Sequence, residues 1–245
     1  MSKAVTGVLY APGTNCHEET IAAIELAGGQ ARLVLLRDLM DGRDRLENYQ
    51  AAVVPGGFSY GDHLGAGRVF GIALVARLSE QLGAFLDRGK PLLGVCNGFQ
   101  ALTEAGILPS RTPGKRSMAL IENQSARFED RKVRLVVSDD ECIWTKGLAG
   151  QVLSMPSAHG EGRPLLCETG STGTRVALRY VDSTGNPTMQ YPENPNGAPG
   201  SVAGVTDKTG LILGLMPHPE RAAFPAQYSQ DGLRVFQNLV AWLAR

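Results

Sequence analysis

The amino-acid sequence predicts an α/β fold: an open, mostly parallel central sheet flanked by helices, with an antiparallel extension in the second half. Two observations carry this prediction. In the first half, short apolar runs alternate with segments of helical length, which is typical of βαβ units. After about Gly114, short strand-like segments are separated by turns rich in glycine and proline. With 245 residues and 43% hydrophobic content, the chain can bury one sizeable core, so we expect a single domain over residues 1–245.

The first half is expected to form four strands, most of them followed by a helix. In a parallel sheet of this kind, the working residues gather beyond the carboxyl ends of the strands. Three loops meet that condition: APGTNCH, PGGFSYGDH and GVCNGFQ. The expected strands are Val5–Tyr10, Arg32–Leu36, Ala51–Val54 and Leu92–Val95, and the expected helices are Glu18–Ala27, Val69–Leu86 and Phe99–Ala105.

The second half is expected to extend the same sheet. Asn186–Gly200 is too rich in proline and glycine for a helix and is predicted to be a loop. Gly232–Ala244 has apolar residues at helical spacing and is predicted to be the helix that closes the fold. The expected strands are Arg131–Val137, Gln151–Met155, Arg175–Val181, Ser201–Val205 and Leu211–Leu215.

Charge and cysteine content exclude several classes of function. Lysine plus arginine and aspartate plus glutamate number 24 each, so nothing in the net charge favours nucleic acid or an anionic membrane as a partner. Arg111, Lys115 and Arg116 could still contact a phosphate or a protein. The 4 cysteines form no CxxC pair, so we expect no metal site and no disulfide framework. No apolar stretch approaches the roughly 18 residues of a membrane span, so a soluble, cytoplasmic protein is expected.

Residues 91–100, PLLGVCNGFQ, resemble a nucleophile elbow. In such an elbow a strand ends at a sharp turn, and the nucleophile lies at the start of the next helix. Gly94 and Gly98 would let strand and helix approach closely, and the helix N-terminus would favour the thiolate of Cys96. The alternative is an inert, buried cysteine between glycines, because free cysteine is among the most buried residue types. This segment alone does not decide between the two.

A cysteine nucleophile needs a base and usually a group that orients the base. His218 follows an apolar run in LILGLMPHPER, and Glu220 lies two residues further on. In an extended segment both side chains point to the same side, so the carboxylate could accept a hydrogen bond from the imidazole. The alternative, a surface turn closed by two prolines, is weakened by the presence of an elbow cysteine in the same chain.

Acyl transfer also requires hydrogen-bond donors for an oxyanion. The backbone N–H of Asn97, the residue after the elbow cysteine, is one candidate. Gly56 and Gly57, which follow a strand in VVPGGFSYGD, are candidates for a second N–H donor. A simple strand-ending turn is the alternative for this segment.

With these elements in chain order, the sequence resembles the class I (triad-type) glutamine amidotransferases. It is most similar to the glutaminase subunits of the phosphoribosylformylglycinamidine synthases, the formylglycinamide ribonucleotide amidotransferases of purine synthesis. The stretches that carry this likeness are APGTNCHEET, PGGFSYGDHLGAG, SAHGEGR, YPENPNGAPGSVAGV and MPHPER, which together span nearly the whole chain. The resemblance implies a single glutamine amidotransferase domain that hydrolyses L-glutamine to glutamate and ammonia.

The resemblance also implies roles for individual residues. Cys96 would attack the glutamine amide and form a thioester, His218 would move protons, and Glu220 would orient His218. The N–H groups of Gly57 and Asn97 would hold the oxyanion. The substrate-binding residues implied are Gln100, His159 and Glu161, although HGEG could equally be a turn that contacts a partner subunit.

The implied partner is a large synthase subunit that binds formylglycinamide ribonucleotide, ATP and magnesium, and a small bridging subunit can accompany it. This chain has no G-x-x-x-x-G-K-[ST] phosphate loop, so no cofactor is expected in it, and ATP and magnesium are assigned to the partner. The ammonia would be passed to the synthase, which converts formylglycinamide ribonucleotide to formylglycinamidine ribonucleotide.

Several alternatives stay open at this stage. Cys16 is a rival nucleophile because it also follows a strand and a glycine, although it lacks the pair of elbow glycines. The first loop is less acidic than is common in these subunits, so the sequence does not define what this loop contacts. Ser110–Arg116 is unusually basic, which could alter docking without touching the triad. The other functions considered are a glutaminase of another synthase, a DJ-1/PfpI-like cysteine protein and a catalytically silent regulatory subunit.

Overall fold

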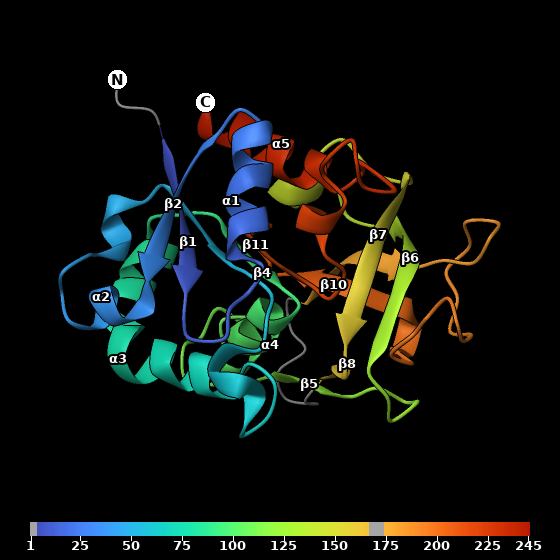
Figure 1. Ribbon diagram of the computed structural model, residues 1–245, viewed down its shortest axis with the longest axis horizontal. Coiled ribbons are helices and arrows are strands. Elements are labelled where there is room, and N and C mark those ends of the chain that lie inside the picture. Colours follow the sequence, from blue (N-terminus) through green and yellow to red (C-terminus); the bar gives the residue numbers. More distant parts are fainter. Residues whose placement is uncertain (1–3, 167–173) are drawn as a thin grey trace.

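The computed structural model describes residues 4–166 and 174–245, so Cys167 lies outside the described residues. Its centre is a nine-stranded sheet with the strand order β2-β1-β3-β4-β11-β10-β9-β6-β7, which Figure 1 shows between its flanking helices. The sheet runs from the blue N-terminal strands to the yellow and orange strands of the second half. Strands from both halves of the chain therefore share one sheet.

The first five strands in this order are parallel and form one half of the sheet. β11, from the C-terminal region, pairs with β4 in parallel, so that Gly214 lies beside Gly94. Every residue of β3 and β4 is buried, as expected for strands covered on both faces. The bounds are β1 Val5–Tyr10, β2 Gln30–Leu35, β3 Ala51–Val54, β4 Leu92–Val95 and β11 Ile212–Leu215.

The remaining strands form the antiparallel extension. In β7, buried residues alternate with partly exposed ones, which is the pattern of a strand with one covered face. A separate two-stranded antiparallel sheet, β5 with β8, was not expected from the sequence. The bounds are β5 Met118–Glu122, β6 Glu129–Val137, β7 Val152–His159, β8 Glu161–Leu166, β9 Arg175–Tyr180 and β10 Val202–Thr206.

The helices cover both faces of the parallel half. α1 packs against α5, and α3 packs against α4. The chain passes from β1 to β2 towards one edge of the sheet, and from β3 to β4 towards the other edge. Because both crossovers are right-handed, α1 and α3 lie on opposite faces of the sheet. The helices are α1 His17–Leu26, α2 Leu36–Met40, α3 Arg68–Asp87, α4 Asn97–Glu104 and α5 Leu233–Leu243, with 3₁₀ turns at Leu46–Asn48, Ser59–Asp62, Ile143–Thr145, Pro199–Ser201 and Pro219–Arg221.

Helix α3 corrects one expectation. The sequence was expected to contain no segment long and apolar enough to cross a membrane. α3, with 20 residues and a mean hydropathy of 1.4 in its most apolar window, is long and apolar enough by length and composition alone. The same composition suits a core helix, and α3 packs against α4 and contributes a row of apolar residues to the hydrophobic core. The buried residues are Phe70, Gly71, Leu74, Leu78, Leu82, Phe85 and Leu86.

The strand order creates a crevice where the functional loops can meet. β2 and β3 lie on either side of β1, so the direction of the crossovers reverses between β1 and β3. In open α/β sheets, ligands bind outside the carboxyl ends of the strands at such a switch point.

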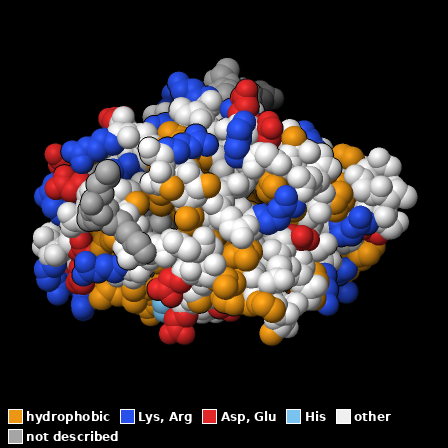
Figure 2. All heavy atoms as spheres, turned by 90° about the horizontal axis from the view of Figure 1, so that it is seen from above, with side chains coloured by type: hydrophobic (Ala, Val, Ile, Leu, Met, Phe, Trp, Pro, Cys, Tyr) orange, Lys and Arg blue, Asp and Glu red, His pale blue; other side chains and the backbone are white. Residues whose placement is uncertain are grey.

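The surface of the molecule in Figure 2 carries both acidic and basic side chains, in agreement with the net charge of +0.

Candidate active site

Cys96 lies at a strained turn between β4 and α4. Its backbone has φ 49° and ψ −107°, and the helix begins at the next residue, Asn97. The two neighbouring glycines make this turn possible: a Cβ on Gly98 would lie 1.8 Å from the carbonyl oxygen of Val54, and one on Gly94 would lie 2.7 Å from Leu102. The predicted nucleophile elbow is therefore present, for the steric reason that the sequence indicated.

The thiol of Cys96 faces the strand β7. It donates a hydrogen bond to the carbonyl oxygen of Ala158, with an S···O distance of 3.4 Å, and the residue is 4% exposed. Asn97 is the first helical residue of α4, so its backbone N–H has no intrahelical acceptor. This N–H and the helix dipole place positive potential next to the sulfur.

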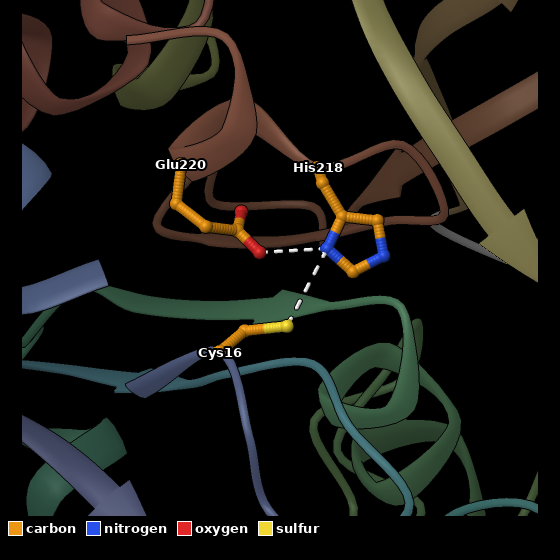
Figure 3. Close-up of side chains that lie close together, drawn as sticks. All are labelled: Cys16, His218 and Glu220. Atoms are coloured by element: carbon orange, nitrogen blue, oxygen red, sulfur yellow. Dashed lines mark hydrogen bonds and ion pairs between the residues drawn. The ribbon is translucent and has the colours of Figure 1, made fainter. Parts of the chain in front are cut away.

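His218 and Glu220 form the pair that the sequence predicted. His218 lies just before the 3₁₀ turn Pro219–Arg221, and its Nδ1 is 2.6 Å from Oε1 of Glu220. Both side chains are buried. The Nδ1–H therefore donates to the carboxylate, and the other ring nitrogen, Nε2, has no hydrogen-bond partner among the described residues. Figure 3 shows Nε2 turned away from Glu220.

Opposing effects act on the charge of His218. Burial favours the neutral ring, but the charges of Glu220 and Cys96 and the Cys16 thiol, 3.9 Å from Nδ1, raise the pKa of His218 well above its ordinary value. The surroundings of His218 therefore favour the protonated ring. A cysteine–histidine nucleophile pair uses a histidine of this kind beside its cysteine.

Cys16, the rival nucleophile, lies next to Nδ1 of the same ring. Its Sγ is 3.9 Å from Nδ1 of His218 (Figure 3), the nitrogen already bonded to Glu220, and it accepts a hydrogen bond from Arg221 at 3.2 Å. Burial raises the pKa of the Cys16 thiol, although its hydrogen bond with His218 and the charge of Arg221 lower it. Cys16 is 1% exposed and does not face the free nitrogen of the base, so the geometry favours Cys96 as the nucleophile.

The glycine loop after β3 is anchored to the elbow by side chains. Gly57 has φ 145°, a backbone conformation that favours glycine. The side-chain oxygen of Asn97 accepts hydrogen bonds from the N–H and the hydroxyl of Ser59, at 3.1 and 2.6 Å, and its amide donates to Asp62 at 3.0 Å. The segment that carries Gly57 is therefore bonded to the start of α4, which carries Asn97, the other expected oxyanion donor. Ser59 and Asp62 were not identified from the sequence.

Gln100 and Glu161 line a pocket of about 490 Å³ between α3, α4 and β5. The side chain of Gln100 donates to the carbonyl oxygen of Glu161 at 2.5 Å and accepts a bond from Asn97 at 3.0 Å. The carboxylate of Glu161 lies 3.3 Å from the N–H of Ala66. The structure thus brings Gln100 and Glu161 together at one pocket wall.

His159, the third expected substrate contact, points into the interior instead. Its Nδ1 lies 3.1 Å from Oδ1 of Asn123, and a Cβ on Gly162 would lie 2.5 Å from the ring. Burial and the charge of His218 lower the pKa of His159 to about 4, against the opposing charge of Glu129. The ring is therefore neutral near pH 7, and it does not line the pocket that Glu161 lines.

The NPNG segment supports the chain reversal around His159. Asn196 is fully buried, and its amide donates to the carbonyl oxygen of Gly162 at 2.6 Å. Asn194 accepts from Ala198 N–H at 2.9 Å. The predicted loop character of residues 186–200 is confirmed, but these contacts were not expected, because side-chain contacts between distant segments leave no periodic signal.

Cys16, His218 and Glu220 are the one group of three potential metal-ligating side chains in the part of the chain that the structure describes. Magnesium prefers oxygen ligands, which a thiol and an imidazole do not provide. The guanidinium of Arg221 next to Cys16 also opposes a cation. This cluster does not suit a magnesium ion.

Comparison with known proteins agrees with this geometry. Residues 3–243 match the CobB/CobQ-like glutamine amidotransferase domain. A Dehalococcoides mccartyi protein named phosphoribosylformylglycinamidine synthase subunit PurQ is 40% identical over 253 residues, covering 99% of this chain and 98% of that protein. Its namesake from Pyrococcus horikoshii is 40% identical over 239 residues, covering 97% of this chain and 98% of that protein.

A solved structure has the same fold over nearly the whole chain. A chain in the structure of PurLQS from Thermotoga maritima superposes with a TM-score of 0.81 at 33% identity, covering 98% of this chain and 99% of that one. The chain therefore belongs to the CobB/CobQ-like glutamine amidotransferases and, among them, to the PurQ glutaminase subunits of phosphoribosylformylglycinamidine synthase.

Proposed function

We propose that Cys96, His218 and Glu220 are the catalytic triad by which this glutaminase subunit releases ammonia from L-glutamine. The observation that carries the proposal is the strained elbow that places Cys96 at the start of α4. The charge of Cys96 raises the pKa of His218, and His218 is hydrogen-bonded to Glu220 at 2.6 Å. A nucleophile, a base and an orienting carboxylate from two distant segments thus form one buried unit.

In the first half of the reaction, the Cys96 thiolate attacks the side-chain amide carbon of glutamine, and the carbonyl oxygen becomes an oxyanion. The N–H groups of Gly57 and Asn97 stabilise that charge, and each such donor contributes on the order of 10²–10³ in rate. His218 Nε2 gives its proton to the departing nitrogen. Ammonia leaves, and a γ-glutamyl thioester on Cys96 remains.

In the second half, His218 is neutral and takes a proton from water. The resulting hydroxide attacks the thioester through a second oxyanion, glutamate is released, and the thiolate–imidazolium pair is restored. Glu220 acts throughout as a hydrogen-bond acceptor for Nδ1–H, which leaves Nε2 free to exchange protons. Every proton taken up in one half-reaction is thus returned in the other.

The pocket beside Gln100 and Glu161 suits the amino-acid end of glutamine. The Glu161 carboxylate offers an acceptor for the α-ammonium group, and the Gln100 amide retains hydrogen-bonding capacity beyond its two internal bonds. His159 then contributes by supporting the backbone of this segment, since its ring is bonded to Asn123.

Ammonia from this site serves a synthase partner. We assign formylglycinamide ribonucleotide, ATP and magnesium to that large subunit, with a small bridging subunit in the assembly. Two properties of this chain support the assignment: it has no phosphate-binding loop motif, and its one three-residue ligand cluster among the described residues does not suit magnesium. We expect the complex in the cytoplasm.

The test compares two nitrogen sources in the assembled complex. Cys96→Ala should lower glutamine-dependent synthesis more than about a thousandfold, because the nucleophile is removed, while synthesis from added ammonia is unchanged. Cys142→Ala is the matched control, since Cys142 is a buried cysteine outside this site and should retain both activities.

A second measurement identifies the nucleophile directly. An electrophilic glutamine analogue should alkylate Cys96, with protection by glutamine, as mapped by mass spectrometry of the complex. Alkylation of Cys16 instead would contradict the assignment. Loss of both activities in Cys96→Ala would mean that Cys96 is structural.

A further inference from the structure

The first loop of the chain, Ala11–Cys16, is bonded to the loop that carries the oxyanion donor. The two loops follow β1 and β3, the strands on either side of the switch point. Phe58 N–H donates to Gly13 O at 2.9 Å, and Cys16 N–H donates to Gly56 O at 3.2 Å. These two bonds lie on either side of an antiparallel bridge between Thr14 and Gly57.

This bridge determines the direction of the Gly57 N–H. The bond next to the bridge runs from Phe58 N–H to Gly13 O, and no hydrogen bond joins Thr14 to Gly57 among the described residues. Thr14 and Gly57 are therefore a non-hydrogen-bonded pair, in which the N–H of Gly57 points away from Thr14. The fit is tight: a Cβ on Gly57 would lie 2.7 Å from Asn15 N and 2.8 Å from Gly13 O. The first loop therefore holds the oxyanion donor in place.

The last residue of the first loop, Cys16, also contacts the base. Its sulfur accepts from Arg221 at 3.2 Å, lies 3.9 Å from Nδ1 of His218, and lies 3.4 Å from the side-chain oxygen of Asn15. Arg221 is in turn paired with Glu19 of α1 at 3.4 Å. One residue thus joins the oxyanion loop through its backbone and the base through its side chain.

The imidazole of His218 has little freedom in this arrangement. A Cβ on Gly56 would lie 2.7 Å from Cε1 of His218 and 3.2 Å from the sulfur of Cys16, so ring and thiol pack directly on the glycine backbone. Glu220 and Cys16 both lie on the Nδ1 side of the ring (Figure 3). Nε2 is left as the nitrogen that can serve Cys96.

We infer that Cys16 is a positioning residue that orients the His218 ring and fixes the oxyanion loop from the same point. It acts through His218 and Gly57 and is not itself a nucleophile. The inference rests on the proposed triad, and it assigns a role to the cysteine that the triad does not use.

The test uses three variants in the assembled complex, with glutamine hydrolysis as the activity. Cys16→Ala removes the sulfur and should lower kcat about tenfold with KM within about twofold, the size expected for loss of one hydrogen-bonding group. Cys16→Ser keeps a donor and acceptor and should recover most of the activity. Cys142→Ala, the same change at a buried cysteine outside the site, should have the wild-type kcat.

The pH profile provides a readout that a purely structural role would not change. The groups that act on His218 are Glu220 from its own turn, Cys16 and Cys96 from the starts of α1 and α4, and His159 from β7. Arg221 acts on Cys16 and Glu220 from the same turn. Loss of the Cys16 thiol removes one group that favours the imidazolium. The alkaline limb of kcat/KM should therefore move to lower pH in Cys16→Ala and stay in place in Cys16→Ser.

The outcomes separate this inference from the function on which it rests. The proposed triad is wrong if the wild-type complex does not hydrolyse glutamine. It is also wrong if the Cys96→Ala variant still hydrolyses glutamine. If the triad holds but Cys16→Ala has the wild-type kcat and alkaline limb, the positioning role is wrong. Equal losses of kcat in Cys16→Ala and Cys16→Ser, each matched by an equal loss of thermal stability, would also overturn it in favour of packing alone.

Discussion

Two buried histidines in this site differ in protonation because their neighbours differ. The charges of Glu220 and Cys96 raise the pKa of His218 despite its burial. Burial and the positive charge of His218 both disfavour protonation of His159, and they lower its pKa to about 4. Its Nδ1–H donates to Asn123, and Nε2 is buried without a partner among the described residues, as suits a neutral ring. An imidazolium and a neutral imidazole therefore coexist at the same pH.

This difference predicts how His159 affects stability in acid. Its folded-state pKa lies below the unfolded value of about 6.5, so its contribution is complete above that pH and is lost as the pH falls towards about 4. Between pH 7 and pH 5 the loss from this residue should be about 2 kcal/mol. Urea unfolding at both pH values should show that loss in the wild type.

The matched variant is His159→Gln, which keeps a donor for Asn123 and cannot titrate in this range. Its free energy of unfolding should fall less between pH 7 and pH 5, by about the amount assigned to the histidine. An identical fall in both proteins would show that His159 does not titrate with the depressed pKa.

At the level of elements, the site depends on segments with little regular structure. β7 ends at His159 and β8 begins at Glu161, and the chain between them is supported by the loop 186–200. Asn196 donates to Gly162 O and accepts from Ala198 N–H at 3.1 Å. Buried asparagines thus supply the hydrogen bonds that a strand partner would otherwise supply.

Removing one of these side chains should weaken both fold and activity. Asn196→Ala leaves the buried carbonyl of Gly162 without this donor, so we expect the free energy of unfolding to fall by about 1–3 kcal/mol. Glutamine hydrolysis should fall as well, because Glu161 belongs to the same chain reversal. Urea unfolding and the hydrolysis assay measure the two effects.

Asn186→Ala is the control in the same loop. Asn186 is exposed, and among the described residues its side chain bonds only to Thr184, so its stability change should stay within about 0.5 kcal/mol. Similar losses in both variants would contradict a special role for Asn196.

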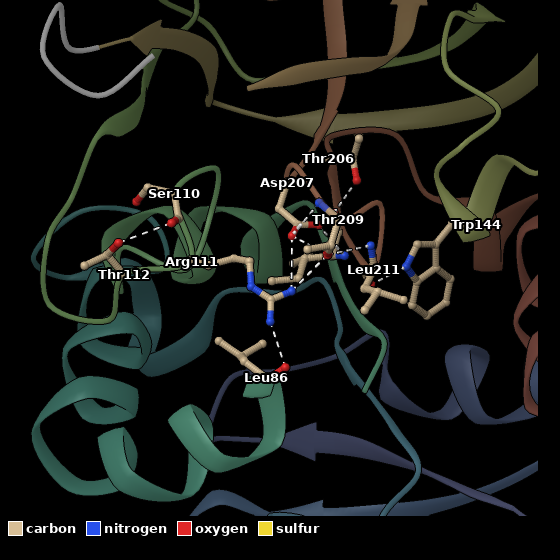
Figure 4. Close-up of polar contacts among 10 residues, drawn as sticks. Leu86, Ser110, Arg111, Thr112, Trp144, Thr206, Asp207, Thr209 and Leu211 are labelled. Carbon is tan, nitrogen blue, oxygen red and sulfur yellow. Dashed lines mark hydrogen bonds and ion pairs between the residues drawn. The ribbon is translucent and has the colours of Figure 1, made fainter. Parts of the chain in front are cut away.

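In the whole molecule, a buried ion pair connects the parallel half of the sheet to the antiparallel extension. Arg111, which follows α4, contacts Asp207 at 3.2 Å, in the turn between β10 and β11, and donates to Leu86 O at the end of α3 at 2.7 Å (Figure 4). Arg111 was considered a possible phosphate or partner contact from its sequence neighbourhood. Its guanidinium instead makes these internal contacts.

Disrupting this connection should reduce stability and spare the chemistry. Asp207 is fully buried and accepts hydrogen bonds from Thr209 and Ile212 as well as the ion pair. Asp207→Asn leaves Arg111 without its counter-charge, so we expect a loss of about 3 kcal/mol in the free energy of unfolding. The kcat of the folded variant should equal that of the wild type.

Asp182→Asn is the matched control, because Asp182 makes similar local bonds to Thr184 and Asn186 but is only partly buried. Its loss should stay below about 1 kcal/mol. A loss as large as that of Asp207→Asn would mean that the local turn, and not the buried ion pair, carries the stability.

The elements that the sequence predicted best are those with a strong local signal. β1, β3 and β4 match their expected bounds, and α1, α3 and α5 differ by one residue at most at each end. Fully apolar runs, helical spacing and flanking glycines depend only on neighbouring residues. The elbow at Cys96 and the pairing of His218 with Glu220 belong to the same class, since each is encoded within a few residues.

The tertiary structure decided the contacts between segments distant in the chain. The separate sheet of β5 and β8, the insertion of β11 beside β4, and the inward turn of His159 depend on packing partners more than thirty residues away. The same holds for Cys16. The sequence made it a rival nucleophile, but in the folded chain its sulfur lies next to Nδ1 of His218. Local residues determine strands, helices and turns. The position of Cys16 next to Nδ1 of His218 depends on how the sheet orders its strands.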